Sequence, residues 1–384
     1  MSTNLRAPGR SDASDRARHQ PWYVSRKVRI GLDVTFVRPD RIAGIERHAL
    51  SLVPELARLS AGEIVLFTAP DAPPELVELP VEQHAPLLRN RLAVEQAWLP
   101  WAAARARVDL LHGLAYPTPV AWRGPSALTV HDATPWLYPE SMSLGARWYY
   151  RPLLPVALRR ADAVFTVSES AREDLVRAAG VPREKIAVTP NGVNERFFDA
   201  HAPEGPRGPY LLAVGTLEPR KNLPLLLDAL RLLRREARDL ELVLVGRIGW
   251  LQSLPLSDLA PHVRLAGSVP DEELPALYAG AACFVLPSLY EGFGLPLAEA
   301  MAAGVPAVAS DIPALREVGG ETVRYADPRD AESFARAIRA ALDDREGSQL
   351  RVAAARGRAR RFRWESAARA TLAVYRDVLR SRRA

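Results

Sequence analysis

The feature that most constrains this chain is a repeated alternation of short β-branched, apolar runs with amphipathic stretches. The alternation fills the first half, stops at a segment rich in proline and glycine, and then begins again. Strands that alternate with helices favour βαβ units and parallel sheets. The 384 residues also exceed the usual size of one domain. We therefore predict an α/β protein with two doubly wound, Rossmann-like domains that face a central cleft.

The hydrophobic pattern also places the individual elements. In the first half it predicts strands over residues 28–34, 63–67, 108–111, 127–130, 163–167 and 186–188, and helices that include 44–59 and 170–179. In the second half it predicts strands over residues 210–214, 240–245, 263–265, 283–286 and 307–309, and helices over 224–236, 271–279, 296–303 and 331–342. Open sheets of this kind bind ligands at the carboxyl ends of their strands, so the loops after strands are the expected site.

Domain boundaries follow from the same pattern. The polar residues 1–25 are expected to be a disordered leader, and residues 26–198 the first domain. Residues 199–209 hold three prolines and two glycines and are the expected linker. Residues 210–361 would form the second domain, and residues 362–384 an amphipathic helix.

Several classes of protein are excluded by the sequence. No apolar run approaches the ~18–20 residues that span a bilayer, and the N-terminus lacks the apolar core of a signal peptide. The one cysteine, Cys283, excludes an internal disulfide and a cysteine-based metal site. These features favour a location in the cytoplasm.

Positive charge is concentrated at the C-terminus. The net charge is +6, but residues 351–384 carry eleven arginines against Glu365 and Asp377, so the remaining residues sum to about −3. This stretch could contact an anionic membrane from its inner face, or it could be a solvated helix face. Nucleic-acid binding would rest on this stretch alone, without a recognised aromatic and basic module, and is not expected.

The strongest motif follows the fourth strand of the second half. A glycine-bearing loop leads to Pro296, which suits the first position of a helix, and such a helix start directs free backbone N–H groups toward an anion. Gly292 and Gly294 would let the backbone approach a ligand closely. Glu291 and Glu299 could accept hydrogen bonds from sugar hydroxyls; alternatively they are a loop acid and a helix-dipole acid.

Three further residue groups lie after strands or at a helix start. Arg220 and Lys221 follow the first strand of the second half, where their charges suit a diphosphate, with a solvated basic pair as the alternative. His131 ends a strand of the first half and could hydrogen-bond a reacting group, although a structural histidine is the commoner case. Gly44 opens the first helix and could allow close approach of a phosphate or acceptor, or be a turn glycine.

Taken together, these motifs resemble those of a known family. Residues 291–299 resemble the E-x7-E signature of the retaining GT-B glycosyltransferases of group 1, family four. Four other segments occur in the order typical of that family, namely residues 167–169, 190–193, 215–222 and 310–313, so the resemblance covers nearly the whole chain after residue 26. The stretch from Phe362 to Tyr375 is similar to the family's final helix, which crosses back onto the first domain.

The resemblance implies transfer of a hexose from a nucleotide-diphosphate sugar with retention of anomeric configuration. It further implies no metal ion, no cofactor beyond the nucleotide sugar, and no protein nucleophile, because the leaving phosphate itself helps to deprotonate the acceptor. Arg220 and Lys221 would neutralise the leaving diphosphate. His131 would contact the sugar near the reacting carbon, with Asp132 orienting it. Together with Glu291, these cations and His131 are the expected catalytic residues.

The same resemblance assigns the donor to the second domain and the acceptor to the first. Glu299 would bind the ribose hydroxyls of the nucleotide. Glu291 would hold the donor sugar and phosphates. The remaining residues expected to bind the donor are Gly44, Asp132, Asn191, Gly215, Gly292, Phe293, Gly294 and Leu295.

The identity of the substrates stays open at this point. The sequence of residues 215–222 resembles that of polysaccharide and O-antigen transferases that use GDP-mannose. UDP- and dTDP-sugars also fit, because the base would be selected by backbone contacts around residues 246–249 and 268–270, which the sequence does not specify. The acceptor could be a glycan, a lipid-linked sugar or a small molecule. Many family members have two glycines where this chain has Ala43 and Gly44, which leaves the acceptor geometry open. The alternatives are an epimerase or hydrolase of the same fold, or a non-catalytic nucleotide-sugar-binding protein.

Overall fold

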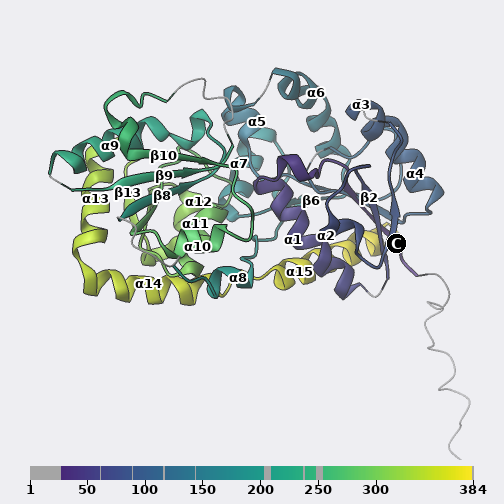
Figure 1. The fold of residues 1–384 in the computed structure, drawn as a ribbon. Helices are drawn as coiled ribbons and strands as arrows, with labels where there is room; N and C mark the ends of the chain where they lie inside the picture. The colour runs from purple at the N-terminus through teal and green to yellow at the C-terminus, as the bar shows by residue number, and fades with distance from the viewer. Residues whose placement is uncertain are drawn as a thin grey trace, which may run out of the picture.

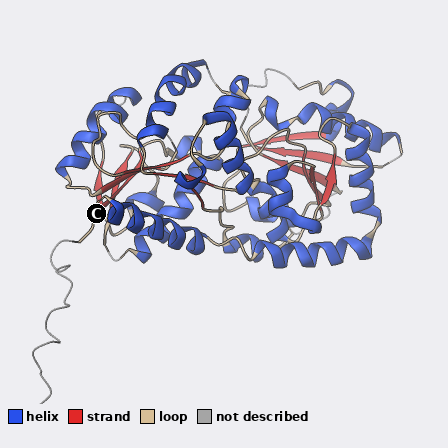
Figure 2. Cartoon of the chain, turned by 180° about the vertical axis from the view of Figure 1, so that it is seen from behind, coloured by secondary structure: helices blue, strands red, loops and turns tan. Residues whose placement is uncertain are grey.

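A computed structural model describes residues 27–60, 62–88, 90–115, 117–142, 144–202, 209–236, 238–247 and 254–382. The predicted leader, residues 203–208 of the predicted linker, and residues 248–249 of one predicted base-contacting loop lie outside the described residues. The described chain forms two parallel sheets with helices on both faces of each (Figure 1, Figure 2). The predicted fold class is therefore confirmed.

The first sheet has seven parallel strands in the order β3-β2-β1-β4-β5-β6-β7. They are β1 (Ile30–Val34), β2 (Ile64–Thr68), β3 (Glu82–His84), β4 (Leu110–Gly113), β5 (Ser126–Thr129), β6 (Ala163–Thr166) and β7 (Ile186–Val188). The strands at the centre are buried along their whole length, as expected of a sheet covered by helices on both faces. The strand order reverses between β1 and β4, which leaves a crevice at their carboxyl ends.

The second sheet repeats this plan with six parallel strands in the order β10-β9-β8-β11-β12-β13. They are β8 (Tyr210–Val214), β9 (Glu241–Val245), β10 (Val263–Gly267), β11 (Cys283–Leu286), β12 (Ala307–Ser310) and β13 (Arg324–Ala326). Here the order reverses between β8 and β11. The loops after these two strands carry the two strongest motifs of the sequence, so the topology brings them to one crevice.

Helices connect the strands in both halves. Those of the first half are α1 (Gly44–Leu59), α2 (Pro74–Val77), α3 (Arg91–Ala93), α4 (Leu99–Arg105), α5 (Thr134–Leu137), α6 (Leu144–Arg160), α7 (Glu169–Ala179) and α8 (Glu195–Phe198). Those that follow are α9 (Leu223–Arg235), α10 (Leu274–Ala279), α11 (Leu295–Ala303), α12 (Pro313–Gly319), α13 (Ala331–Asp343), α14 (Arg345–Ala359) and α15 (Trp364–Ser381). Among the helices described, none is both long and apolar enough to cross a bilayer.

The last two helices lie on different domains. In Figure 1, α14 runs along the second domain and α15 continues beneath the first. Trp364, Leu372 and Tyr375 of α15 are buried in the same apolar core as Leu32 of β1 and Leu52 of α1. The sequence predicted an amphipathic helix that returns to the first domain, and this is where α15 lies.

Arginines of the basic C-terminal stretch bind groups of the chain itself. Arg382 Nε donates to Asp162 Oδ1 at 2.7 Å, and Arg358 Nε donates to the carbonyl oxygen of Val318 at 2.6 Å. Arg369 donates twice to Glu365, one turn earlier on α15. Several arginines of residues 351–384 are therefore bound to carboxylates or carbonyl oxygens of the chain itself.

Several parts of the chain differ from the predicted elements. Helix α6 was not predicted, because Pro152 and Pro155 interrupt its pattern and its apolar residues form no clear stripe. Strands β3 and β13 were missed because each is a three-residue strand at the edge of its sheet. Helix α10 begins at Leu274 rather than at residue 271, where the Asp271 side chain instead binds arginines of the first half.

Candidate active site

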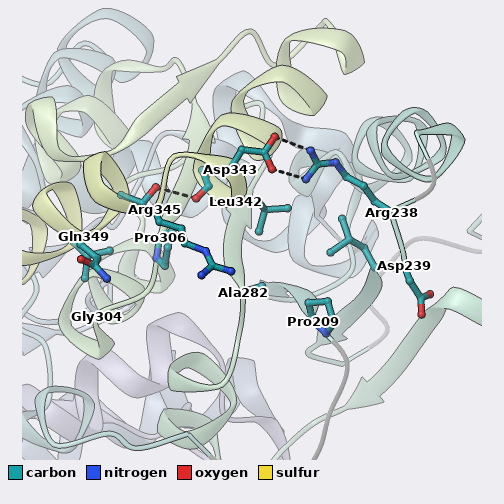
Figure 3. A pocket seen from close by; sticks show the side chains of 14 residues that line it. Pro209, Arg238, Asp239, Ala282, Gly304, Pro306, Leu342, Asp343, Arg345 and Gln349 are labelled. Carbon is teal, nitrogen blue, oxygen red and sulfur yellow. Dashed lines mark hydrogen bonds and ion pairs between the residues drawn. The ribbon is translucent and has the colours of Figure 1, made fainter.

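The second sheet has a cavity of about 610 Å³ at the end where its strands begin (Figure 3). Pro209, Leu240, Ala282 and Pro306, which line it, directly precede β8, β9, β11 and β12. None of the predicted site residues lines this cavity. Ligands of doubly wound sheets bind at the opposite, carboxyl ends of the strands, so the active site is expected at that edge.

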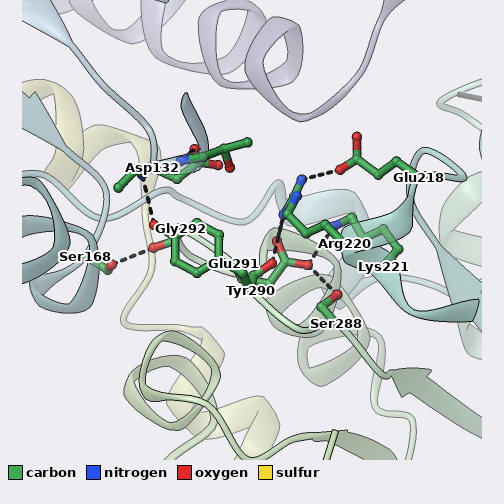
Figure 4. Close-up of polar contacts among 11 residues, drawn as sticks. Asp132, Ser168, Glu218, Arg220, Lys221, Ser288, Tyr290, Glu291 and Gly292 are labelled. Atoms are coloured by element: carbon green, nitrogen blue, oxygen red, sulfur yellow. Dashed lines mark hydrogen bonds and ion pairs between the residues drawn. The ribbon is translucent and has the colours of Figure 1, made fainter. Parts of the chain in front are cut away.

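Two cations and a carboxylate meet at the carboxyl edge of the second sheet (Figure 4). Arg220 and Lys221 follow β8, and Glu291 follows the neighbouring strand β11. Lys221 Nζ donates to Glu291 Oε1 at 2.6 Å, and Arg220 Nη1 donates to Glu291 Oε2 at 3.1 Å. Ser288 Oγ also donates to Glu291 Oε1, at 2.7 Å. Glu291 thus accepts three hydrogen bonds and keeps about one of its lone-pair positions for a ligand.

This cluster is buried and strongly charged. The exposed fraction of the side chain is 15% for Arg220, 11% for Lys221 and 7% for Glu291. Burial alone would raise the pKa of Glu291, but the charges of Lys221 and Arg220 outweigh it and lower the pKa to about 2. Burial would likewise lower the pKa of Arg220, but Glu291 and Glu218 raise it above its usual value. Glu291 and Arg220 are therefore both charged at neutral pH. Glu218 Oε1 lies 2.6 Å from Arg220 Nη2.

The loop after Glu291 needs its two glycines. A Cβ atom on Gly292 would lie 2.2 Å from the carbonyl oxygen of His131, because the loop touches the first domain there. The carbonyl oxygen of Gly292 accepts a hydrogen bond from Ser168 Oγ of the first domain. Gly294 precedes α11 with a φ of +94°, a conformation that favours glycine. No described side chain caps this end of α11, so its backbone N–H groups are suited to bind an anion.

Glu299 lies on α11 and is held by residues of both domains. Its Oε2 accepts a hydrogen bond from Tyr278 Oη at 2.9 Å, and its Oε1 lies 3.7 Å from Arg47 Nη1 of α1. Arg47 also binds Asp271, at 2.6 Å. Burial raises the pKa of Glu299, while Arg47 acts in the opposite direction. The carboxylate predicted to bind ribose is therefore linked to an arginine of the other domain.

His131 lies on the first-domain side of the cleft. Its Nε2 is 3.1 Å from the carbonyl oxygen of Leu114, and its ring meets that of His48 edge-on, with centroids 4.6 Å apart. Burial lowers the pKa of His131 to about 4 and that of His48 to about 3, so both rings are neutral at pH 7. Because a carbonyl oxygen only accepts, Nε2 of His131 carries the proton and Nδ1 remains an acceptor.

Asn191 and Asp132 make contacts within the first domain. Asn191 Oδ1 lies 2.8 Å from Nδ1 of the buried His48. Asn191 therefore contacts His48, which in turn packs against His131. Asp132 Oδ1 accepts a hydrogen bond from the backbone N–H of Thr134 at 2.8 Å. The charge of Asp132 also raises the pKa of Arg220, but less than the charges of Glu291 and Glu218 do.

The other predicted donor residues present mainly backbone. A Cβ atom on Gly44 would meet no atom within 4 Å, so there is open space beside the start of α1. Gly215 follows β8 with a φ of +149°, beside the Lys221 side chain. The Phe293 side chain is buried in the core of the second domain and packs edge-on against Phe362. Leu295 is the first residue of α11.

A cavity of about 250 Å³ lies beside the charged cluster and is lined by both domains. His131, Asp132 and Ile45 line it from the first domain, and Glu218 and Arg220 from the second. Of the predicted site residues, His131, Asp132 and Arg220 line this one space, and Ile45 directly follows the predicted Gly44. Such a cavity can hold a reacting group between the Arg220 guanidinium and the neutral imidazole of His131.

A pair of carboxylates in the first domain was not predicted. Asp33 lies one residue before the end of β1. Thr35 donates to its Oδ1 from both its N–H, at 3.0 Å, and its hydroxyl, at 2.7 Å. Burial and then the charge of Glu95 raise the pKa of Asp33 to about 6. Neither carboxylate lines the 250 Å³ cavity.

Other supporting residues were also missed. Arg47 and His48 lie three and four positions after Gly44, on the same face of α1, so helical spacing could have placed them beside the predicted glycine. Glu218 and Ser288 lie inside the two motifs, but nothing in the sequence indicates that they bind Arg220 and Glu291 rather than a ligand.

Two family models match consecutive parts of the chain. The model for "Glycosyltransferase Family 4" matches residues 42–197, and the model for "Glycosyl transferases group 1" matches residues 195–359. The chain is 31% identical to O-antigen chain mannosyltransferase B of Escherichia coli, over 87% of this chain and 96% of the relative. It is 32% identical to the phosphatidyl-myo-inositol mannosyltransferase of Mycolicibacterium smegmatis, over 87% of this chain and 90% of the relative.

Solved structures share the fold. Anabaena Alr3699/HepE in complex with UDP and glucose superposes with a TM-score of 0.69 at 18% identity, over 91% of this chain and 100% of that one. The sucrose-phosphate synthase of Thermosynechococcus elongatus superposes with a TM-score of 0.68 at 21% identity, over 92% and 100%. At this level of identity, the comparison concerns the architecture of the two domains.

Proposed function

Because the chain belongs to the group 1 glycosyltransferases with the GT-B fold, we propose that it transfers a hexose from a nucleotide-diphosphate sugar with retention of anomeric configuration. The observation that carries this proposal is the buried cluster of Arg220, Lys221 and Glu291 at the reversal point of the second sheet. A diphosphate is the ligand best matched to two buried cations beside an uncapped helix start.

The leaving group would lie against the second domain. Lys221 has three donor positions and Arg220 has five, so both can bind phosphate oxygens while they keep their bonds to Glu291. Arg220 Nε is buried and forms no hydrogen bond with a described residue. The N–H groups of these two cations would stabilise the diphosphate as it departs, and we propose that the reaction needs no metal ion. Glu291 would chiefly orient the two cations, with one lone pair left for a sugar hydroxyl.

The sugar would lie between the charged cluster and His131. The bond from its anomeric carbon to the diphosphate breaks, and a bond from that carbon to the acceptor oxygen forms on the same face. The acceptor proton passes to the departing phosphate oxygen. His131 would accept a hydrogen bond from a sugar hydroxyl at Nδ1, because its Nε2–H is used by Leu114. Glu299 would give up its long contact with Arg47 and bind the ribose hydroxyls instead.

GDP-mannose is the donor we favour. Two relatives that match most of the chain are named as mannosyltransferases, one of O-antigen chains and one of phosphatidyl-myo-inositol. A structural neighbour was solved with UDP, so UDP-sugars are the next candidates. The acceptor would be a glycan or a lipid-linked sugar.

The test is transfer from GDP-mannose in the presence of a chelator, with the anomeric configuration of the product read by NMR. We expect the α configuration of the donor to be kept and the rate to be independent of added divalent cations. A β-linked product would refute the retaining mechanism. Release of free mannose as the main product, at the same rate with and without acceptor glycans, would favour the hydrolase alternative.

A further inference from the structure

A second cavity adjoins the one that contains the reaction site. It has a volume of about 370 Å³ and lies between α5 and α6 in the first domain. The two cavities share four lining residues, namely Pro135, Met142, Tyr150 and Leu154. We call the second cavity the outer pocket. A molecule bound there could extend through the shared wall toward His131.

The outer pocket is positively charged. Arg147 and Arg151, one turn apart on α6, line it, and none of the described lining residues is acidic. Neither arginine forms an ion pair with a described residue, in contrast to Arg220. In the sequence, Glu140 is the one acid among residues 134–155. The pocket is therefore suited to an anion such as a phosphate group.

Apolar side chains are exposed directly beside these arginines. On α6, Trp148 is 80% exposed and Leu144 is 74% exposed. Leu87, in the segment before α3, is also fully exposed. Large apolar side chains grouped on a surface with cations are typical of contact with a lipid layer, and tryptophan favours its interface.

The position of α6 at an edge of the first domain also favours contact with a flat surface such as a membrane. Figure 1 shows α5 and α6 along one edge of the first domain, with α15 along the opposite edge. A membrane that touches α6 would therefore not touch α15, where the basic C-terminal stretch lies.

We propose that the outer pocket binds the phosphate headgroup of a lipid-borne acceptor, and that Leu144 and Trp148 insert into the apolar layer beside it. The proposal rests on the proposed function, because it is the adjoining reaction cavity that makes this ligand an acceptor. Arg147 and Arg151 would bind the phosphate, and the glycan attached to it would pass Tyr150 and Met142 to reach the transferred sugar.

The test is flotation of the full-length protein with phosphatidylcholine vesicles, with and without phosphatidylglycerol. We expect binding to the anionic vesicles that weakens with salt. The double variant Arg147→Gln, Arg151→Gln should bind about 25-fold more weakly, since each cation near an anionic surface contributes about fivefold. Trp148→Ala should also weaken binding. The matched control, Arg361→Gln with Arg376→Gln, removes the same charge from the C-terminal stretch and should bind as the wild type does.

Several results would overturn the proposal. These are failure of the wild type to float, equal binding of the α6 double variant and the wild type, or loss of binding only in the control. Stabilisation of the wild type by inorganic phosphate that is lost in the α6 variant, without flotation, would assign the pocket to a soluble phosphate. A change of molar mass in Trp148→Ala, measured by light scattering, would assign the face to a second copy of the chain. Stabilisation by GDP should be equal in all variants; its absence throughout would refute the proposed function instead.

Discussion

At the scale of single residues, the site depends on how Glu291 divides its hydrogen bonds. Two cations and a serine hydroxyl occupy three of its lone-pair positions, so its main effect is to fix the direction of Arg220 and Lys221. The sequence could predict that these residue types lie near one another, because they follow neighbouring strands of a doubly wound sheet. It could not predict that the carboxylate binds the cations rather than the ligand, since that depends on distances of a few tenths of an ångström.

Replacement of Lys221 tests the charge at the leaving group. We expect Lys221→Ala to lower kcat/KM for sugar transfer by about 10²–10³-fold, the usual cost of one group that stabilises developing negative charge. Glu291 would keep Arg220 and Ser288 as partners, so the protein should still fold. Lys27→Ala, at an exposed lysine, is the control. Activity of Lys221→Ala equal to that of the control would remove the assigned role.

Asp33 gives the chain a pH-dependent stability. Its pKa in the folded protein is about 6, above the ordinary 3.8, so the folded state holds the proton more tightly than the unfolded state does. Stability should therefore fall as the pH rises from about 4 to about 6, and the full penalty, up to about 3 kcal/mol, applies above that range. Asp33→Asn should remove the penalty.

The measurement is the free energy of unfolding in denaturant at pH 4 and at pH 8. Asp33→Asn should gain stability relative to the wild type at pH 8 and little at pH 4. Asp239→Asn, at a fully exposed aspartate, should show no such difference. An equal effect of Asp33→Asn at the two pH values would contradict the shifted pKa.

At the scale of elements, the loop from β11 to α11 joins the two domains. The Gly292 backbone lies so close to the His131 carbonyl group that no side chain fits between them. Most strands were predictable, because buried parallel strands are continuous apolar runs. Helix α6 was not, because its two prolines and its exposed Trp148 do not form the pattern of an amphipathic helix. The face that we assign to a lipid-borne acceptor could therefore not be predicted from the sequence.

Substitution of Gly292 tests this contact. Gly292→Ala would place a Cβ atom 2.2 Å from a backbone oxygen, so the loop must move away from the first domain. We expect a loss of sugar transfer of at least tenfold, measured as kcat/KM, with the fold of each domain kept. Gly357→Ala is the matched control: it lies inside α14 with no atom near the new Cβ, and it should stabilise the protein by about 0.5–1 kcal/mol. Full activity of Gly292→Ala would show that the close approach is dispensable.

At the scale of the whole molecule, the chain is built from two copies of one topology. Each sheet reverses its strand order once, between β1 and β4 in the first and between β8 and β11 in the second. The site residues of both domains lie in loops that follow strands at or near these reversal points. The sequence predicted this fold class, and the family comparisons confirm the membership that the motifs indicated. Contacts between the domains, such as Arg47 with Asp271 and Glu299, were not predictable, because their partners are more than 200 positions apart.

The most direct test of the account is whether a nucleotide sugar binds the folded chain without metal. Thermal unfolding would be recorded in a chelator with GDP-, UDP-, dTDP- and ADP-sugars, for the wild type and for Lys221→Ala. Ligand at a hundred times its Kd stabilises the folded state by about 2.7 kcal/mol, which corresponds to a rise of several degrees in Tm. We predict the largest rise with GDP-mannose and a much smaller one in the variant. No rise with any of the nucleotide sugars, or an equal rise in Lys221→Ala, would contradict the donor site described here.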